Sequence, residues 1–325
     1  MRRICAVTPA VRFPVSTSLL RRLAFANIVA NVAIVVTGGA VRLTASGLGC
    51  PTWPRCTDES YTTTPEMGVH GMIEYGNRLL TFVLVLIAGA ALLAALLHRP
   101  RRRSVTLLAA SVVLGILAQA VIGGITVRTQ LHPSIVGIHF VVSMLLLLVS
   151  YALWRRIGEP DSPARLLVPV PLRTLVRITS AASAAVIVAG VAVTGSGPHA
   201  GDADAVRNGL DPESISQVHA DLVFLLVGLS LALWLALRAV GAPAAARRAA
   251  GLLLAAELAQ GVVGFVQYVT NLPAVLVGAH MLGSCLVWLA TLSMLWSIRD
   301  RHPATSPVHA PPNPTRTADV APAAI

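Results

Sequence analysis

The chain has no lysine and little charge of either sign. All 25 of its basic residues are arginines, and charged residues make up 12% of the 325 positions. A soluble globular protein carries roughly 25% charged residues, so this chain cannot cover the surface of a soluble domain of its size. The shortage of charge excludes a cytosolic enzyme, a secreted disulfide scaffold and a disordered chain.

What the chain has instead is apolar sequence in long runs. Hydrophobic residues make up 55% of it, and its mean hydropathy is +0.73. A helix that crosses a bilayer needs about 20 apolar residues, and eight runs reach that length, at 23–43, 71–97, 105–127, 134–154, 174–195, 215–238, 249–270 and 274–298. Because each run is continuously apolar rather than alternating, it predicts a helix and not a barrel strand. The sequence therefore predicts an all-α integral membrane protein with eight transmembrane helices.

The arginines predict which side each loop faces. An even number of helices places both termini on one side of the membrane. Twenty of the 25 arginines fall on that side, in the segments 1–22, 98–104, 155–177, 238–248 and 299–325. By the positive-inside rule this side is cytoplasmic. The net charge of +11 then reflects topology, and it does not indicate a nucleic-acid partner.

Two short patterns occur twice. The string A-Q-x-V-x-G is found at 118–123 and 259–264, and V-G-x-H follows at 136–139 and 277–280, with the same spacing in both copies. We therefore expect two pseudo-repeated four-helix bundles of the same orientation. The expected parts are a cytoplasmic N-terminus (1–22), an N-terminal half (23–155), a cytoplasmic linker (156–173), a C-terminal half (174–298) and a disordered cytoplasmic tail (299–325).

The repeat also aligns the second helix with the sixth. Ile73-x-x-x-Asn77 corresponds to Ile215-x-x-x-His219, so the N-terminal half has asparagine where the C-terminal half has histidine. The first outer loop, between the first and second helices, is also longer than its counterpart in the other half.

Three histidines lie inside the apolar runs, each a few residues from the outer end of its helix: His139, His219 and His280. Ionisable residues in a membrane are costly and usually functional. Opposed imidazoles from facing helices can hold haem iron on both faces, so His219 and His280 are candidate ligands of one metal centre. Zinc is disfavoured, because no carboxylate or thiolate completes a tetrahedral set at that depth. A polar residue bonded across helices is the alternative for any one of them. Small residues nearby leave room for a flat macrocycle or serve ordinary helix packing: Gly137, Ala220, Gly278 and Gly283.

The N-terminal half carries a carboxylate near its histidine. Glu74 and Asn77 are three residues apart and share a helix face with Arg78 one turn beyond Glu74. The Glu74 carboxylate is a candidate proton acceptor or charge stabiliser opposite His139. An ion pair between Glu74 and Arg78 at the helix end is the structural alternative.

Cys50 and Cys56 lie in the first outer loop, within C-P-T-W-P-R-C. Because that side is oxidising, we expect a disulfide that closes a short loop. A redox-active pair is the second interpretation. Cys5 and Cys285 are expected to be free thiols.

At these residues the sequence resembles the heme A synthase family of bacteria, over nearly its whole length. The resemblance is carried by five strings: V-T-G-G-A-V-R-L-T-A-S-G-L-G-C-P-T-W-P-R-C at 36–56, I-E-Y-G-N-R-L-L at 73–80, G-G-I-T-V at 123–127, G-S-G-P-H-A-G-D at 195–202 and H-A-D at 219–221.

The resemblance implies an enzyme of the bacterial plasma membrane that oxidises the C8 methyl of haem O to a formyl group, with water as the oxygen source. It implies a haem b cofactor on His219 and His280, and a substrate haem on His139 near the outer face. It also assigns the essential carboxylate to Glu74 and the first-loop disulfide to Cys50 and Cys56. The implied partners are haem O synthase, cytochrome oxidase assembly, an electron acceptor outside the chain and the lipid bilayer. A homo-oligomer is compatible with such a chain.

The sequence departs from the family in two places. Many relatives have histidine where this chain has Asn77, and His70, two turns outward, is a substitute ligand if the helix extends that far. Arg78 is expected beside the substrate. Some relatives also carry a cysteine pair in the third outer loop, which this chain lacks, so other contacts must hold that loop.

Two rival functions remain at the level of sequence. A di-haem electron-transfer cytochrome would need histidine pairs near both membrane faces, whereas the three intramembrane histidines share one level. A transporter with a histidine proton relay would favour broken helices and acids at mid-membrane. Glu257, expected near the inner end of the seventh helix, is the only candidate acid.

Overall fold

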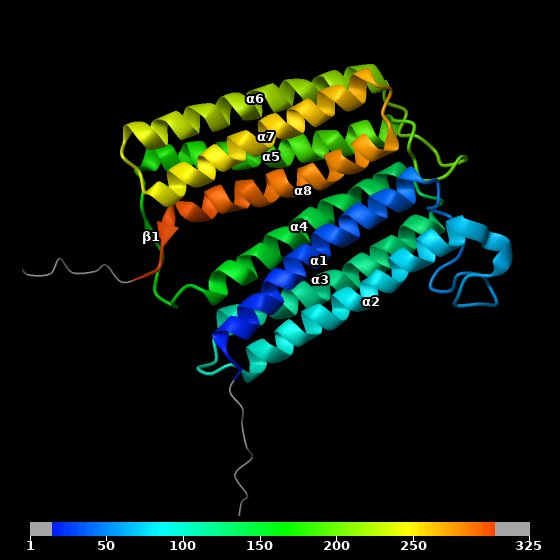
Figure 1. Ribbon diagram of the computed structural model, residues 1–325, viewed down its shortest axis with the longest axis horizontal. Coiled ribbons are helices and arrows are strands. Elements are labelled where there is room, and N and C mark those ends of the chain that lie inside the picture. The colour runs from blue at the N-terminus through cyan, green and yellow to red at the C-terminus, as the bar shows by residue number, and fades with distance from the viewer. Residues whose placement is uncertain (1–14, 303–325) are drawn as a thin grey trace, which may run out of the picture.

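Figure 1 shows a computed structural model, which describes residues 15–302. Its long helices are α1 (Thr17–Leu43), α2 (Gly68–Leu97), α3 (Arg103–Arg128), α4 (Pro133–Ile157), α5 (Val170–Ser196), α6 (Pro212–Ala239), α7 (Ala244–Val269) and α8 (Ala274–Ser297). These 8 helices are each long and apolar enough to cross a membrane. The prediction of an all-α membrane protein with eight transmembrane helices is therefore confirmed. Cys5 and the predicted tail from residue 303 onward lie outside the described residues.

Several helices extend beyond their apolar runs at the arginine-rich end. α1 begins at Thr17 rather than at residue 23, because the Ser16 hydroxyl accepts a hydrogen bond from the Leu19 amide (3.2 Å) and caps the helix. α7 begins at Ala244 and includes Arg247 and Arg248. Arginines fit into a helix end because their long stems let the charged heads reach the membrane surface.

The longer α7 changes the depth of one acid. Residue 257 is 13 positions from the first residue of α7 and 12 from the last. Glu257 therefore lies in the middle of α7, and the expectation that it sits near the inner end was wrong.

The eight helices form two four-helix groups, which Figure 1 shows as α1–α4 and α5–α8. Within the first group α1 packs on α2 and α4, and α3 packs on the same two helices; in the second group α5 and α7 each pack on α6 and α8. The groups meet where α1 and α4 contact α8 and where α4 contacts α5. These contacts agree with a duplicated arrangement, although the repeat itself stays an interpretation of the sequence.

A buried cluster joins the two groups. Met144 and Tyr151 of α4 pack with Cys285 and Trp288 of α8, and the Trp288 indole donates a hydrogen bond to the Met144 carbonyl (2.9 Å). Cys285 is a free, fully buried thiol, as predicted. An apolar seam that also satisfies its indole N–H holds the two halves in one fixed arrangement.

The outward faces of the helices are apolar. Phe82, Phe224 and Phe265 have 67%, 74% and 68% of their surface exposed. Large exposed apolar patches are rare on soluble monomers and are the rule on lipid-facing surfaces. The chain is therefore a multi-pass membrane protein, and the exposed apolar side chains form its lipid-facing surface.

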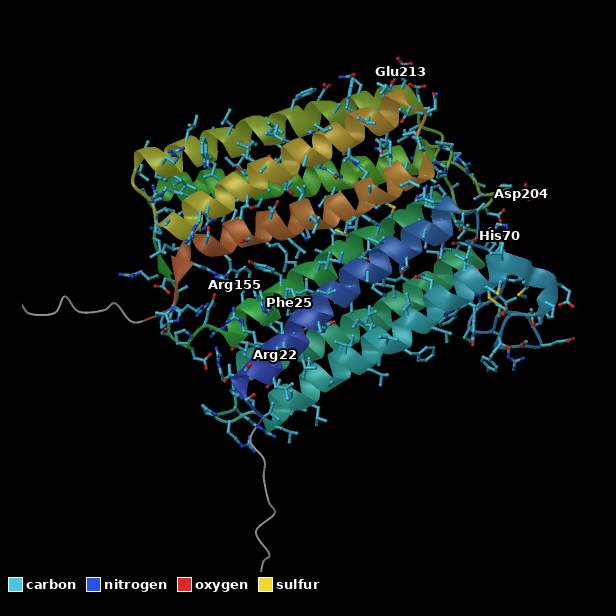
Figure 2. The ribbon with its side chains drawn as sticks, viewed as in Figure 1. Arg22, Phe25, His70, Arg155, Asp204 and Glu213 are labelled. Carbon is cyan, nitrogen blue, oxygen red and sulfur yellow. A yellow bond between two sulfur atoms is a disulfide. The ribbon has the colours of Figure 1, made fainter. Side chains whose placement is uncertain are left out.

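Both ends of the described chain lie at the same end of the bundle (Figure 1), and Figure 2 shows Arg22 and Arg155 at that end, with Asp204, Glu213 and His70 at the opposite one. That the arginine-rich end is cytoplasmic stays a prediction.

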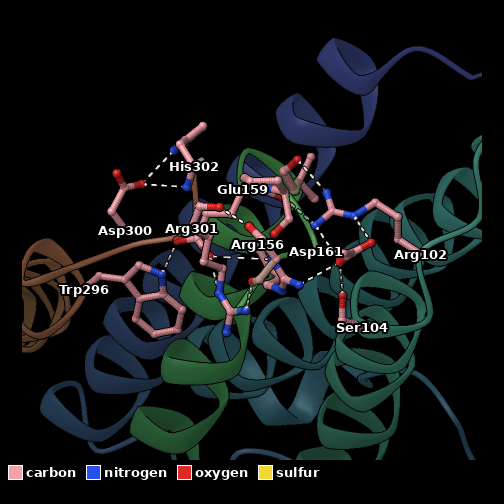
Figure 3. A network of polar contacts seen from close by, with 12 residues as sticks. Arg102, Ser104, Arg156, Glu159, Asp161, Trp296, Asp300, Arg301 and His302 are labelled. Carbon is pink, nitrogen blue, oxygen red and sulfur yellow. Dashed lines mark hydrogen bonds and ion pairs between the residues drawn. The ribbon is translucent and has the colours of Figure 1, made fainter. Parts of the chain in front are cut away.

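The linker between the halves is pinned at the arginine-rich end by a polar network (Figure 3). Arg102 and Arg156 both contact the Asp161 carboxylate, at 3.1 and 2.7 Å, and Trp296 donates a hydrogen bond to Glu159 (2.8 Å). The hydrogen bond from Arg102 lowers the pKa of Asp161 below its usual value. The linker is thus tied to the first half through Asp161 and to the end of the second half through Glu159.

A short strand pair completes this attachment. β1 (Arg165–Leu166) pairs antiparallel with β2 (Arg299–Asp300), directly after α8.

Candidate functional site

The C-terminal half brings two of the predicted histidines together. His219 is seven residues from the start of α6, and His280 is six residues from the start of α8. Their ring centroids are 6.5 Å apart, and the ring planes are inclined by 71°. The two histidines singled out from the sequence therefore lie next to each other, whereas their role as ligands of one metal centre stays a prediction.

Glycines on the neighbouring helices make room for both rings. An ideal Cβ at Gly190 of α5 would lie 3.2 Å from His219 Cε1, and one at Gly264 of α7 would lie 3.1 Å from His280 Cε1. Both distances are tighter than an ordinary van der Waals contact, so even an alanine methyl would press on the rings. α5 and α7 can approach the two imidazoles this closely because these positions have no side chain.

The histidine pair fits a metal ion with two imidazole ligands. Two metal–nitrogen bonds of roughly 2 Å each, with about 1 Å from each ring nitrogen to its ring centre, span about 6 Å. The Nδ1 atoms of both rings are buried and have no hydrogen-bond partner in the described part of the chain. A buried unsatisfied nitrogen is costly unless a further group is present. No group of three His, Cys, Asp or Glu that could hold a metal occurs within residues 15–302, so the donor set here is a pair of imidazoles, as on the two faces of haem iron.

His139 of the N-terminal half has surroundings that match those of His280. Gln119 of α3 donates a hydrogen bond to the His139 carbonyl (3.0 Å), as Gln260 of α7 does to the His280 carbonyl (2.7 Å). An ideal Cβ at Gly123 would lie 3.4 Å from His139 Cε1. The matched glutamines fix the turn of helix that carries each histidine. The repeated spacing Gln–x19–His in the sequence corresponds to this hydrogen bond.

The opposite wall of the N-terminal half differs from that of the C-terminal half. Asn77 of α2 accepts a hydrogen bond from the Thr37 hydroxyl of α1 (2.8 Å). Its side-chain oxygen is thus engaged with the neighbouring helix.

His70 lies on α2 two turns farther out than Asn77. The helix does extend that far, since it begins at Gly68, but the His70 ring is exposed and its Nδ1 is hydrogen-bonded to Ser46 Oγ (2.9 Å). Figure 2 places His70 beside the outer loops. In this conformation the ring binds the loop after α1.

Glu74 and Arg78 form the predicted ion pair, with 2.5 Å between Glu74 Oε1 and Arg78 Nη2. The other carboxylate oxygen, Oε2, accepts a hydrogen bond from the Cys50 amide (2.6 Å). Arg78 also donates to the carbonyls of Cys50 (2.9 Å) and Thr52 (3.0 Å). Both partners of the ion pair therefore hold the first outer loop against α2, and Glu74 is only 5% exposed.

That loop is closed by a disulfide between Cys50 and Cys56, both of which are fully buried. The predicted disulfide is confirmed. Within the loop Trp53 packs directly on Gly124 of α3, where no Cβ would fit. The neighbouring residue, Gly123, faces His139, so the loop covers the helix that borders the predicted substrate site.

The third outer loop is held without cysteines, as its sequence required. Arg42 donates to the carbonyls of Thr194 (2.6 Å) and His199, and the Gly47 amide donates to the Gly201 carbonyl (2.8 Å). The loop after α5 is therefore fastened to the end of α1 and to the loop that follows it.

Comparison with known proteins identifies the family. A family model described as a cytochrome oxidase assembly protein matches residues 21–292. A heme A synthase of Geobacillus kaustophilus is 33% identical over 133 residues, and one of Exiguobacterium sibiricum is 31% identical over 131 residues. The chain belongs to the heme A synthase family. The matched stretches cover 41% and 39% of this chain and only 41% and 43% of these relatives.

In this member of the heme A synthase family, the sequence alone did not indicate which glycines lie against the histidine rings. Three of the small residues singled out from the sequence lie against other side chains, as in the alternative of ordinary helix packing: positions 137 and 278 face Val191 and Leu43 in the other half, and position 283 faces Gln260. The glycines that face the rings are Gly123, Gly190 and Gly264. The repeated A-Q-x-V-x-G string could have revealed two of them, since it ends on Gly123 and Gly264.

Proposed function

We propose that this chain is a heme A synthase, which oxidises the C8 methyl group of haem O to a formyl group to make haem A for cytochrome oxidase. The observation that carries the proposal is an asymmetry: one half presents a close pair of histidines, and the other has one histidine on α4 and a buried carboxylate, Glu74, on α2. An enzyme with one permanent haem and one haem substrate needs such a difference. The names of the relatives support the same activity.

The two halves have separate tasks in this proposal. The C-terminal half, 174–298, holds haem b on His219 and His280, which would supply one-electron redox chemistry. The N-terminal half, 23–155, receives haem O with His139 as its iron ligand. A substrate held by one protein ligand leaves more easily than a cofactor held by two, and the product must leave.

The reaction uses water as its oxygen source. Each hydroxylation of the methyl carbon takes one water and releases two electrons and two protons. Two rounds give a geminal diol, which loses one water and becomes the aldehyde. The electrons pass to an acceptor outside the chain.

Glu74 acts on the developing charge in this scheme. Loss of two electrons and one proton from the methyl group leaves a cationic carbon, which a nearby carboxylate stabilises in a low-dielectric pocket. The same carboxylate accepts a proton from the attacking water. Arg78 and the Cys50 amide hold the Glu74 carboxylate in place, and the Cys50–Cys56 loop with Trp53 keeps bulk water away from α3.

The remaining site residues position the substrate. Asn77, fixed by Thr37, forms the wall opposite His139, and His70 lies at the mouth beside Ser46. Each of the other outer arginines donates to a backbone carbonyl. Arg128, at the end of α3, makes no such bond within the described residues, and it suits a haem propionate.

The cellular setting follows from the same proposal. The protein works in the bacterial plasma membrane with its haem sites near the outer face. Haem O synthase supplies its substrate, and the product enters cytochrome oxidase assembly. The apolar outer faces also provide surface for a homo-oligomer.

The direct test is to express the full chain with a source of haem O and separate the extracted haems by chromatography. We expect haem A together with bound haem b. Bound haem b without any haem A would refute the synthase and favour an electron-transfer cytochrome.

Two matched variants test the role of Glu74. Glu74→Gln keeps an acceptor for the Cys50 amide but removes the charge, whereas Arg78→Gln keeps the charge and weakens the loop. If Glu74 is catalytic, Glu74→Gln abolishes haem A while Arg78→Gln retains part of it, and both keep haem b. If both variants lose haem A formation equally and the loop becomes sensitive to proteases, the Glu74–Arg78 pair only holds the loop in place and has no catalytic role.

The rival functions have weaker support. A transmembrane electron carrier needs haem ligands toward both faces, but His139, His219 and His280 all lie six or seven residues from the loop-rich end of their helices. A transporter would favour broken helices, and α1–α8 are continuous.

A further inference from the structure

The C-terminal half contains a buried acid for which the proposed chemistry has no use. Glu257, in the middle of α7, is 4% exposed. The Ser230 hydroxyl of α6 donates a hydrogen bond to Glu257 Oε1 (2.8 Å), whereas Oε2 is buried and has no partner in residues 15–302. No arginine forms an ion pair with Glu257 in this part of the chain. An ionised carboxylate without a partner is costly inside a membrane, and such residues are usually functional.

The acid lies on the helix faces that form the histidine site. Ser230 is 11 residues, or about three turns, from His219 on α6. Glu257 is seven residues, or about two turns, from Gly264, which borders His280. At about 1.5 Å per residue, these counts place the contact between Glu257 and Ser230 roughly 10 to 16 Å deeper in the membrane than the histidine level. A buried acid and the histidine pair thus share the interior of one bundle.

The N-terminal half has no such acid. If Gln119 corresponds to Gln260, and Asn77 to His219, then Ile116 and Ala88 occupy the positions of Glu257 and Ser230. Both are buried, at 2% and 1% exposed. Packing at this depth therefore does not require a polar pair, and the acid occurs only in the half with two histidines.

We propose that Glu257 takes up one proton when the metal centre on His219 and His280 takes up one electron. This inference rests on the proposed function, which assigns that pair to an iron centre. The electron comes from a one-electron donor and reduces iron from the ferric to the ferrous state, while a proton from water converts the carboxylate into the carboxylic acid. The two additions cancel in charge, so the low-dielectric bundle gains no net charge on reduction. Charges roughly 10 to 16 Å apart interact more strongly in such a medium than in water, because little solvent screens them.

Other ionisable groups on α6, α7 and α8 lie closer to the helix ends than Glu257 does, or face the seam between the two halves. They are Glu213, His219, Asp221 and Arg238 on α6, Arg247, Arg248 and Tyr268 on α7, and His280 and Cys285 on α8. Cys285 belongs to the seam between the halves. None of them is hydrogen-bonded to Glu257.

The test is a redox titration of the full-length, haem b-loaded protein in lipid nanodiscs, with chemical mediators, at a series of pH values between roughly 5 and 9. We expect the midpoint potential to fall by up to about 59 mV for each tenfold decrease in proton activity, the value for one proton per electron. Glu257→Gln still accepts a hydrogen bond from Ser230 but cannot titrate, so its potential should be independent of pH over the same range. A wild-type potential that does not change with pH, or a Glu257→Gln variant that keeps the wild-type slope, would overturn the inference.

Infrared difference spectra give a second readout that does not depend on turnover. Reduction of the wild-type protein should produce a carboxylic-acid C=O band that is missing in Glu257→Gln and shifted in Glu257→Asp. If Glu257→Gln does not fold, Glu257→Asp keeps the test available, since an unshifted band would contradict the assignment. A folded wild-type chain that binds no haem b would refute the proposed function and this inference with it, whereas a haem-loaded chain with a pH-independent potential refutes this inference alone.

Discussion

The two halves place different groups at the same depth in similar bundles. In the C-terminal half His219 faces His280, and both rings lie against glycines. In the N-terminal half His139 keeps its glutamine and glycine contacts, but Asn77 is bonded to Thr37 and a disulfide-closed loop covers the outer end. The comparison shows how one helical arrangement can serve two tasks. With two facing histidines it suits a permanently bound group, and with one histidine, Asn77 and a covering loop it suits a group that is exchanged.

The largest expected effect separates the two sites. His280→Ala should lower the affinity for haem b by more than about 100-fold, because loss of a ligand exceeds the 10–100-fold typical of residues that only support a ligand. His139→Ala should leave haem b in place and reduce haem A formation. Visible spectra and haem stoichiometry of the purified variants report both. Loss of haem b from His139→Ala would mean that the halves do not divide the tasks as proposed.

Making the halves alike should produce a smaller change. Asn77→His restores the C-terminal pattern in the N-terminal half, at the expense of the bond from Thr37. We expect haem retained in that half to increase about tenfold, which corresponds to about 1.4 kcal/mol, and the haem content to approach two per chain. Release of haem A should slow, since the product is then held on both faces. An unchanged haem content would show that position 77 does not face His139.

Glycine substitutions should give a finer comparison. An alanine at position 264 presses on His280, whereas one at position 261 has nothing within 4 Å. Gly264→Ala should therefore weaken haem b binding by roughly 1 kcal/mol, and Gly261→Ala should leave binding unchanged, although both gain helix propensity. Gly123→Ala meets His139 at an ordinary contact distance and should have little effect. Equal affinities for the position-264 and position-261 variants would indicate that the His280 ring can move freely.

The smallest effect is expected in the linker. Arg102 lowers the pKa of Asp161, so this contact stabilises the fold above the carboxyl's unfolded pKa of about 3.9 and is lost as the pH falls through the lower folded value. The Asp161 side chain is 56% exposed, and solvent screening limits its contribution to a fraction of a kcal/mol. Asp161→Asn should lower the thermal stability slightly at pH 7, and the difference should shrink as the pH falls below the unfolded pKa of about 3.9. Haem content should not change. A loss of haem b would mean that the linker controls the C-terminal site.

Much of this fold could be predicted from the sequence, because long apolar runs allow only membrane helices and the arginines indicate which loops lie at the same end of the bundle. The meeting of His219 and His280 was also predictable, since each lies a few residues from the same end of its apolar run and therefore at a similar level. The helix ends were less predictable: an arginine such as Arg247 ends an apolar run without ending the helix, because its stem lets the charge reach the surface.

Contacts between distant segments could not be read in this way. Nothing in the local sequence indicates that Glu74 binds the Cys50 amide or that Trp53 covers Gly124, because these contacts depend on how a 24-residue loop folds back over α2 and α3. The pairing of Glu257 with Ser230 was missed for a related reason, since it depends on how α6 and α7 pack, and α7 begins at Ala244 rather than at residue 249.

The short strand pair after α8 has a consequence for biosynthesis. Ribosomes deliver the linker long before they deliver Arg299 and Asp300, so β1 has no partner until the last helix has been made and inserted. The seam residues Cys285 and Trp288 are equally late. The N-terminal half can therefore assemble in the membrane while the second half is still being translated, but the joint between the halves closes only when the nascent chain has left the translocon through its final span.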